Sequence, residues 1–147
     1  MIKMTYKVRF VDYPEHYRRI WNEITECIED CLSHGDLILR QQTDELEQNL
    51  ASFIGVKHAV GLNSGTDALF FSLKAAGVSP GDEVITVSHT FVATIAAIHY
   101  CGAKPVLIDI ADDMNMDTDA VKRAITSRTR AIIPVHLNGR LCDMAAL

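Results

Sequence analysis

The sequence predicts an α/β fold, with a mostly parallel sheet and helices on both of its faces. Strand-like apolar runs alternate with helix-like runs from His58 onward, and the turns between them are short. This alternation is typical of a parallel sheet, which binds ligands at the carboxyl ends of its strands. The chain has 147 residues and a hydrophobic content of 48%, which is sufficient for a substantial core.

The N-terminal part is predicted to be helical. Apolar residues recur at helical spacing over residues 14–32, which predicts a helix that ends near Gly35. Residues 36–42 then have the composition of a loop. A second helix is predicted to follow, with Thr43 as its N-cap and Gly55 as its stop signal.

The alternating elements follow in regular order. Four strands are predicted, at His58–Leu62, Glu83–Val87, Pro105–Ile110 and Arg130–Val135. Three helices are predicted between them, at Thr66–Ala76, Phe91–Cys101 and Asp117–Thr126. Four strands leave an open sheet edge, and Leu147 comes where another helix would begin. We therefore expect the chain to be one part of a longer protein.

Charge and cysteine content limit the classes of function. Fourteen Lys and Arg against nineteen Asp and Glu give a net charge of −5, which argues against a nucleic-acid partner. The chain has neither a signal-peptide pattern nor an apolar stretch of membrane-spanning length, so we expect a cytoplasmic protein with no membrane partner. Cys27, Cys31 and His34 could hold a metal, but no second ligand pair follows at zinc spacing. We therefore predict buried cysteines on a helix and no metal site.

The motif Ser64-Gly65-Thr66 stands between the first predicted strand and its helix. Gly65 would allow close approach of a ligand, and Thr66 would cap the helix and offer its hydroxyl. An ordinary helix cap after a glycine turn explains these residues equally well. Asp67 must point away from the opening if an anion binds there, because its charge would repel a phosphate. These residues alone leave a phosphate cradle and a simple cap as alternatives.

Polar and aromatic residues follow the other predicted strands. Phe91 lies just inside a helix with Thr90 as its predicted cap, and its ring could stack on a flat ligand or belong to the core. Asp109 ends the third strand and His136 the fourth, although Asp109 could equally be an exposed loop carboxylate. A phosphate cradle, a stacking ring and polar strand ends on one edge suggest a planar phosphorylated cofactor.

Several segments together resemble a known family. In chain order they are Leu46-Glu47, Phe53–Val60, Asn63–Leu69, Gly81–Ile85, Thr90–Thr94, Gly102–Val106, Asp109 and Arg130–Leu137 with Gly139. They resemble the DegT/DnrJ/StrS-type sugar aminotransferases, which depend on pyridoxal 5'-phosphate (PLP) and have the fold type I architecture of aspartate aminotransferase. The resemblance implies that residues 43–147 are the first, incomplete part of the large PLP-binding domain. Residues 1–42 would then be an N-terminal helical segment and loop.

The resemblance also assigns roles to residues. It implies that Ser64, Gly65 and Thr66 bind the PLP phosphate and that Phe91 stacks on the pyridine ring. In this family an aspartate pairs with the pyridine nitrogen and a lysine forms the Schiff base, and we expect both to lie beyond Leu147. The chain would therefore contain no catalytic residue, and we expect it to be inactive on its own.

The activity implied for the full-length protein is amino transfer, usually from glutamate, to a nucleotide-linked keto sugar. Such enzymes serve the biosynthesis of deoxyaminosugars or of cell-surface polysaccharides, and they tend to be homodimers. Two alternatives remain open at this point. One is a PLP-dependent sugar dehydratase of the same family, which has a histidine in place of the lysine, and the other is a non-catalytic truncated binding protein. The sequence does not distinguish them, nor does it identify the sugar.

Overall fold

The computed structural model describes residues 8–35 and 37–147. The chain divides into two compact units, residues 1–61 and residues 62–147. The division expected between residues 42 and 43 stays a prediction. The two units are described separately below.

Helix α1 of the first unit spans Tyr13–His34 and has signals at both ends. The side chain of Asp12 accepts a hydrogen bond from the Glu15 N–H at its start. Gly35 ends it in the left-handed conformation, with φ of 70°, as predicted. The expected burial of Cys27 is wrong, because no residue of α1 is buried. The apolar stripe of α1 is not buried in its own unit, and Ile28 is 53% exposed.

Helix α2 spans Gln41–Ile54, so the predicted cap at Thr43 is wrong. Arg40 is the N-cap and accepts the Thr43 N–H at 2.9 Å through its backbone carbonyl, which places Thr43 inside the first turn. The preceding loop is correspondingly shorter than expected. Gly55 ends the helix with φ of 79°, as predicted.

The strand predicted at His58–Leu62 does not form. A strand requires a hydrogen-bonded neighbour, and no strand among the described residues pairs with this segment. Its chain is irregular instead, and the Gly61 N–H donates to the carboxylate Oε1 of Glu47 at 2.6 Å. Val60 is 76% exposed, so the apolar pattern that predicted the strand is not satisfied by burial within the described chain.

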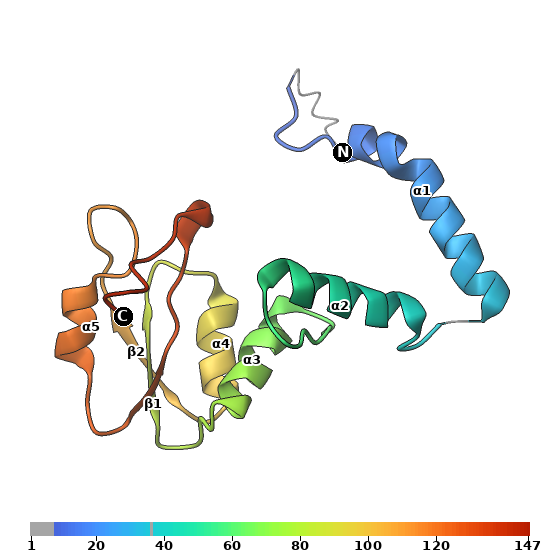
Figure 1. The fold of residues 1–147 in the computed structure, drawn as a ribbon. Helices are drawn as coiled ribbons and strands as arrows, with labels where there is room; N and C mark the ends of the chain where they lie inside the picture. Colours follow the sequence, from blue (N-terminus) through green and yellow to red (C-terminus); the bar gives the residue numbers. More distant parts are fainter. Residues whose placement is uncertain (1–7, 36) are drawn as a thin grey trace, which may run out of the picture. The chain divides into compact units, whose positions relative to one another are not determined.

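The second unit is a three-stranded parallel sheet with helices (Figure 1). Its elements are α3 (Gly65–Ala75), β1 (Glu83–Val87), α4 (Val92–Tyr100), β2 (Lys104–Ile108), α5 (Thr118–Ala124), β3 (Thr129–Ile132) and the short 3₁₀ helix η1 (Leu137–Gly139). The strand order is β2-β1-β3, and both pairings are parallel. The bounds of β1 are those predicted, and the three helices differ from their predicted bounds at their ends.

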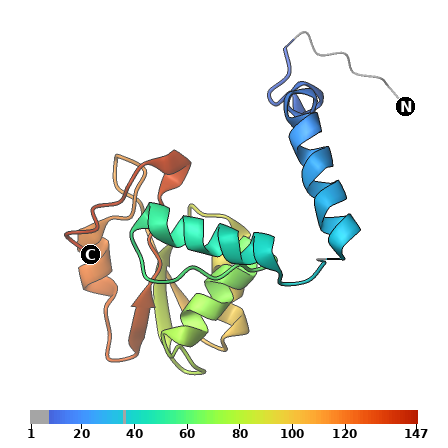
Figure 2. The same ribbon diagram turned by 45° about the vertical axis from the view of Figure 1, so that its right-hand side comes forward.

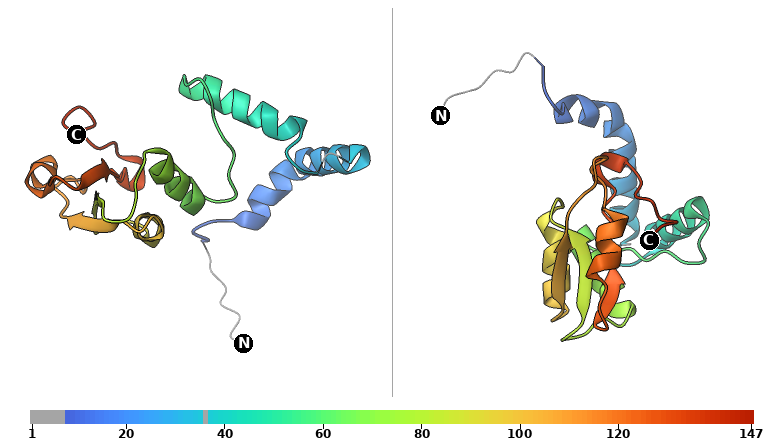
Figure 3. Two further views of the ribbon diagram at one scale, coloured as in Figure 1. Left: turned by 90° about the horizontal axis from the view of Figure 1, so that it is seen from below. Right: turned by 90° about the vertical axis from the view of Figure 1, so that its left-hand side faces the viewer.

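Helices cover both faces of this sheet, as predicted (Figure 2; Figure 3, left). Successive side chains of β1 point to opposite faces. Val84 belongs to a core cluster with residues of α3 and α4, including the fully buried Ile98. Ile85 and Val87 belong to a second cluster, which includes Val121 of α5. A strand buried on both sides in this way accounts for the continuous apolar run in its sequence.

The last strand is shorter than predicted, because β3 ends at Ile132 rather than at Val135. Two hydrogen bonds nevertheless continue the attachment to β1. The Ile133 N–H donates to the Ile85 carbonyl at 2.9 Å, and the Thr86 hydroxyl donates to the Ile133 carbonyl at 3.0 Å. The chain therefore follows β1 for one residue beyond the regular strand.

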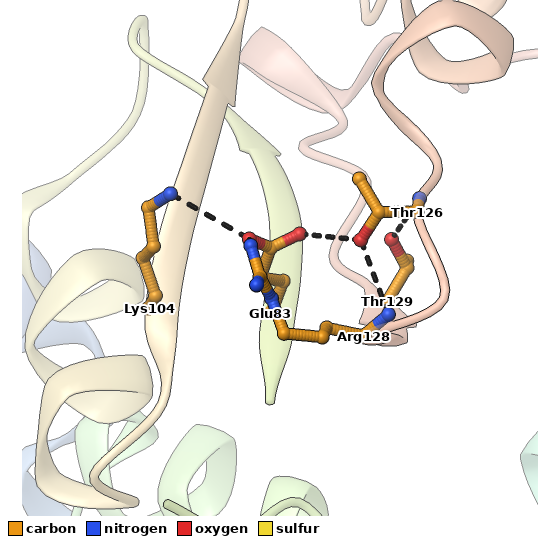
Figure 4. A network of polar contacts seen from close by, with 5 residues as sticks. All are labelled: Glu83, Lys104, Thr126, Arg128 and Thr129. Atoms are coloured by element: carbon orange, nitrogen blue, oxygen red, sulfur yellow. Dashed lines mark hydrogen bonds and ion pairs between the residues drawn. The ribbon is translucent and has the colours of Figure 1, made fainter. Parts of the chain in front are cut away.

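A buried carboxylate lies at the amino end of β1 (Figure 4). Glu83 is 3% exposed and accepts hydrogen bonds from the Thr126 hydroxyl at 2.7 Å and from Nη2 of Arg128 at 2.7 Å. Lys104 Nζ lies 3.5 Å from the same carboxylate. The bond from Thr126, and then that from Arg128, lower the pKa of Glu83 to about 2, although burial opposes the shift. The network joins β1, β2 and the segment that leads into β3.

Candidate functional site

The three parallel strands place their carboxyl ends at one edge of the sheet, which we call the carboxyl edge. Helix α4 follows the end of β1 directly, so it begins at this edge. Helix α3 leads through a short turn into the start of β1, so it runs opposite to β1 and also begins at this edge (Figure 1). Two helix N-termini therefore meet the ends of the strands, which is where ligands bind in such sheets.

Ser64 caps α3. Its backbone is extended, with φ of −156° and ψ of 156°, and its Oγ accepts the Asp67 N–H at 3.1 Å. The prediction that Thr66 is the cap is wrong, because the helix has already begun at Gly65. Since Oγ accepts in this bond, the hydroxyl proton of Ser64 remains available for a ligand.

The first two amides of α3 have no hydrogen-bond partner among the described residues. The N–H groups of Gly65 and Thr66 lie in the first turn, where the helix has no earlier carbonyl to accept them. They carry the positive end of the helix dipole. Gly65 is not in the left-handed region, and a Cβ at this position would meet no atom within 4 Å. The fold itself therefore does not require glycine here, and the space beside its amide is open. That Asp67 points away from this space stays a prediction.

Phe91 lies at the beginning of α4. It is the N-cap residue, so the cap lies one residue later in the sequence than the expected Thr90, whose Oγ1 is paired with Thr94 Oγ1 at 2.9 Å. The alternative that Phe91 belongs to the core is wrong, since the side chain is 74% exposed. An exposed aromatic ring at the carboxyl edge is free to stack on a planar ligand.

Two further polar residues follow the other strands. Asp109 comes directly after β2, and it is an exposed loop carboxylate that accepts the N–H of Ile110 at 2.9 Å. His136 follows β3, and its Nδ1 accepts the Cys142 N–H at 3.1 Å. Both positions were predicted from the sequence, whereas the link to Cys142 was not, because the sequence contains no signal for it.

Membrane-spanning helices and metal-binding clusters are both absent from the described part of the chain. None of its helices is long and apolar enough to cross a membrane. Groups of three or more His, Cys, Asp or Glu side chains placed to hold a metal ion are also absent from residues 8–35 and 37–147.

Comparison with known proteins identifies the family. Residues 18–147 match the DegT/DnrJ/EryC1/StrS aminotransferase family. The chain belongs to this family. Relatives in the DegT/DnrJ/EryC1/StrS family include the dTDP-3-amino-3,4,6-trideoxy-alpha-D-glucose transaminase of Micromonospora megalomicea, which is 43% identical over 92% of this chain. The UDP-2-acetamido-2-deoxy-3-oxo-D-glucuronate aminotransferase of Pseudomonas aeruginosa is 43% identical over 95%. The spore coat polysaccharide biosynthesis protein SpsC of Bacillus subtilis is 44% identical over 85%.

The chain spans only 36% of the length of the Micromonospora relative, 39% of the Pseudomonas relative and 31% of SpsC. Solved structures of the family show the same proportion. DesV of S. venezuelae, solved in complex with a ketimine intermediate, has a TM-score of 0.92 and 40% identity over 97% of this chain and 38% of its own. The sugar aminotransferase Spr1654 of Streptococcus pneumoniae, solved in a PLP-form, has a TM-score of 0.80 and 42% identity over 84% of this chain and 32% of its own. The predicted fold class, part of the large domain of fold type I, is confirmed.

Proposed function

We propose that this chain is the N-terminal part of a PLP-dependent aminotransferase that transfers an amino group from glutamate to a nucleotide-linked keto sugar. The observation that carries the proposal is the open pair of amides at the start of α3, together with an exposed aromatic ring at the start of α4 at the same edge of the sheet. Family membership and the names of the relatives support the reaction class and the sugar substrate.

The start of α3 fits a phosphate. The N–H groups of Gly65 and Thr66 and the hydroxyl of Ser64 would donate to phosphate oxygens, and the helix dipole would favour the negative charge. The hydroxyl of Thr66 adds a fourth donor on the same turn. The absence of a Cβ at Gly65 would allow the phosphate to approach the backbone closely.

The start of α4 fits the ring of the same molecule. Phe91 would stack on the pyridine face, and its exposure allows this without any disturbance of the core. PLP, when bound, supplies an electron sink for the amino transfer. The residues of this chain would hold and orient it, and none of them is assigned a proton transfer.

Several properties of the full-length protein belong to the same proposal. We expect a homodimer in the cytoplasm, with residues 1–42 as a helical segment outside the α/β domain. A role in deoxyaminosugar or cell-surface polysaccharide biosynthesis is supported by what the relatives are named for.

The proposal is tested on the polypeptide that carries this chain in its natural source. The protein is purified, supplied with PLP, reduced with borohydride and analysed by intact mass. A polypeptide with a mass above 16.3 kDa, the mass of these 147 residues, and with one reduced adduct is expected. A protein that acquires no adduct would refute the aminotransferase assignment, because a dehydratase of this family has no lysine to be trapped. Transfer of isotope-labelled nitrogen from glutamate to a nucleotide-linked keto sugar then tests the reaction directly.

A further inference from the structure

His136 lies at the carboxyl edge, on a part of the chain that the proposed cofactor contacts do not use. It follows β3, which pairs directly with β1, whereas Ser64 and Phe91 come from the helices on the other face. Cys142, which holds its ring, belongs to the core cluster on the α5 face. A molecule bound at this edge would therefore meet His136 from the side opposite to α3 and α4.

The imidazole of His136 is attached to a buried anchor. Its Nδ1 accepts the N–H of Cys142 at 3.1 Å, and Cys142 is only 4% exposed. The Sγ of Cys142 in turn lies 3.3 Å from the carbonyl oxygen of Val135, the residue before His136. The bonds of Cys142 to His136 and Val135 thus join the two ends of the segment 135–142, and Cys142 lies in the core.

The loop between β2 and α5 holds the same turn from outside. The side-chain amide of Asn115 donates to the Leu141 carbonyl at 2.9 Å, and Asn115 is 3% exposed. Arg140 Nη1 donates to the Asp113 carbonyl at 3.0 Å. Two contacts from one neighbouring loop, in addition to the bond from Cys142, restrict the position of the imidazole.

These contacts also determine which nitrogen carries the proton. A ring nitrogen that accepts an N–H is unprotonated, so the neutral imidazole of His136 has its proton on Nε2. Nε2 has no hydrogen-bond partner among the described residues, and the residue is exposed. The carboxyl edge therefore has a positioned donor that meets no acceptor in the described part of the chain, and such a donor is suited to an oxygen atom of a ligand.

We propose that the Nε2–H of His136 donates a hydrogen bond to an oxygen atom of the molecule bound at the carboxyl edge. The acceptor belongs either to PLP or to the nucleotide-linked keto sugar, and the experiment below distinguishes the two. The inference rests on the proposed function, because it takes the carboxyl edge as the site of the reaction.

The test compares two variants of the polypeptide that carries this chain. His136→Gln keeps a donor near the position of Nε2 but removes the acceptor for Cys142. His136→Asn keeps an acceptor near the position of Nδ1 but removes the donor. Each variant is measured for the Kd of PLP, for the KM of the keto sugar and for its Tm. The wild-type protein must first bind PLP and transfer nitrogen, so a failure of the proposed function is seen before His136 is tested.

A weakening of about 5- to 100-fold is expected for His136→Asn, with His136→Gln much closer to wild type. A rise in the Kd of PLP assigns the acceptor to the cofactor, and a rise in the KM alone assigns it to the sugar. Wild-type values of both constants in His136→Asn would overturn the proposal. So would losses in both variants that follow a lowered Tm, because they would assign His136 a structural role through Cys142.

Discussion

Replacement of Gly65 should affect binding and stability in opposite directions. The residue is the first of α3, its φ lies outside the left-handed region, and an added Cβ would meet no atom within 4 Å. Gly65→Ala therefore introduces no clash and no backbone strain. It also restricts the unfolded chain, which stabilises a protein when the native conformation accepts the new residue.

The magnitudes follow from these two effects. The free energy of unfolding should rise by about 0.4–1 kcal/mol in Gly65→Ala. A methyl group beside the amide should displace the phosphate from at least one charge-assisted hydrogen bond, which is worth about 1.5–3 kcal/mol. The Kd of PLP should therefore rise about 10- to 150-fold. Gly65→Val, with a larger branched side chain, should weaken PLP binding further without loss of the fold.

The assay is a spectroscopic titration of the apo form of the natural polypeptide with PLP, combined with denaturant unfolding of each variant. Ala75→Val, at the exposed far end of the same helix, is the matched control for an added branched side chain. Its Kd should equal that of wild type. An unchanged Kd in folded Gly65→Val would refute the phosphate assignment.

Three further outcomes are expected. Ser64→Ala removes the cap bond to the Asp67 N–H and should lower the free energy of unfolding by about 1 kcal/mol, whereas Ser64→Thr should keep most of the wild-type stability. Equal denaturation midpoints for Ser64→Ala and wild type would contradict the cap. Phe91→Ala should change the free energy of unfolding by less than about 0.5 kcal/mol, because the residue is 74% exposed. It should nevertheless weaken PLP binding about 3- to 10-fold, whereas Phe91→Tyr should bind PLP nearly as well as wild type. A folded Phe91→Ala variant with wild-type affinity would exclude stacking. The pKa of Glu83 is lowered from its ordinary value of 4.5 to about 2, so its stabilising contribution is complete above pH 4.5 and is lost as the pH falls toward 2. The free energy of unfolding should therefore decrease over this pH range, and Glu83→Gln should remove this pH dependence.

Local signals in the sequence were sufficient for most of the second unit. The run Glu83–Val87 was predicted with its observed bounds, because a strand buried on both faces is apolar almost throughout and polar turns enclose it. Gly35 and Gly55 correctly marked the ends of α1 and α2, since both adopt the left-handed conformation that glycine favours.

Helix starts were less predictable than helix ends. Thr43, Thr66 and Thr90 were each chosen as a cap, and in each case the helix begins at a different residue. The N-cap is the residue whose backbone stays extended before the helix, which is Arg40, Ser64 or Phe91, and only Ser64 makes a side-chain cap bond. The strand at residues 58–62 and the burial of Cys27 failed for another reason. Both depend on neighbours that are distant in the sequence: no described strand pairs with residues 58–62, and Cys27 is exposed.

The location of the candidate site at one edge of the sheet was predictable even though these details were not. Phe91, Asp109 and His136 follow strand ends, and a parallel sheet gathers those ends at one edge whatever the exact bounds of the helices are. Ser64 and Gly65 follow no strand, and they lie at this edge because α3 runs opposite to β1. The exposure of Phe91 and the open space beside Gly65 required the structure, because each is a property of what surrounds the residue. The bond between His136 and Cys142 also required it, since only the fold of the turn brings the two together.

The two ends of β1 have opposite requirements, and this separates stability from binding. At the amino end Glu83 is buried, so its charge must be paired, and Thr126 and Arg128 satisfy it. At the carboxyl edge the amides of Gly65 and Thr66 have no hydrogen-bond partner among the described residues. This is tolerated because Gly65 is exposed and Thr66 is only partly buried. A change at Glu83 should therefore lower the free energy of unfolding without a direct effect on PLP binding. A change at Gly65 should affect PLP binding in a protein that remains folded, which makes the carboxyl edge accessible to mutational analysis.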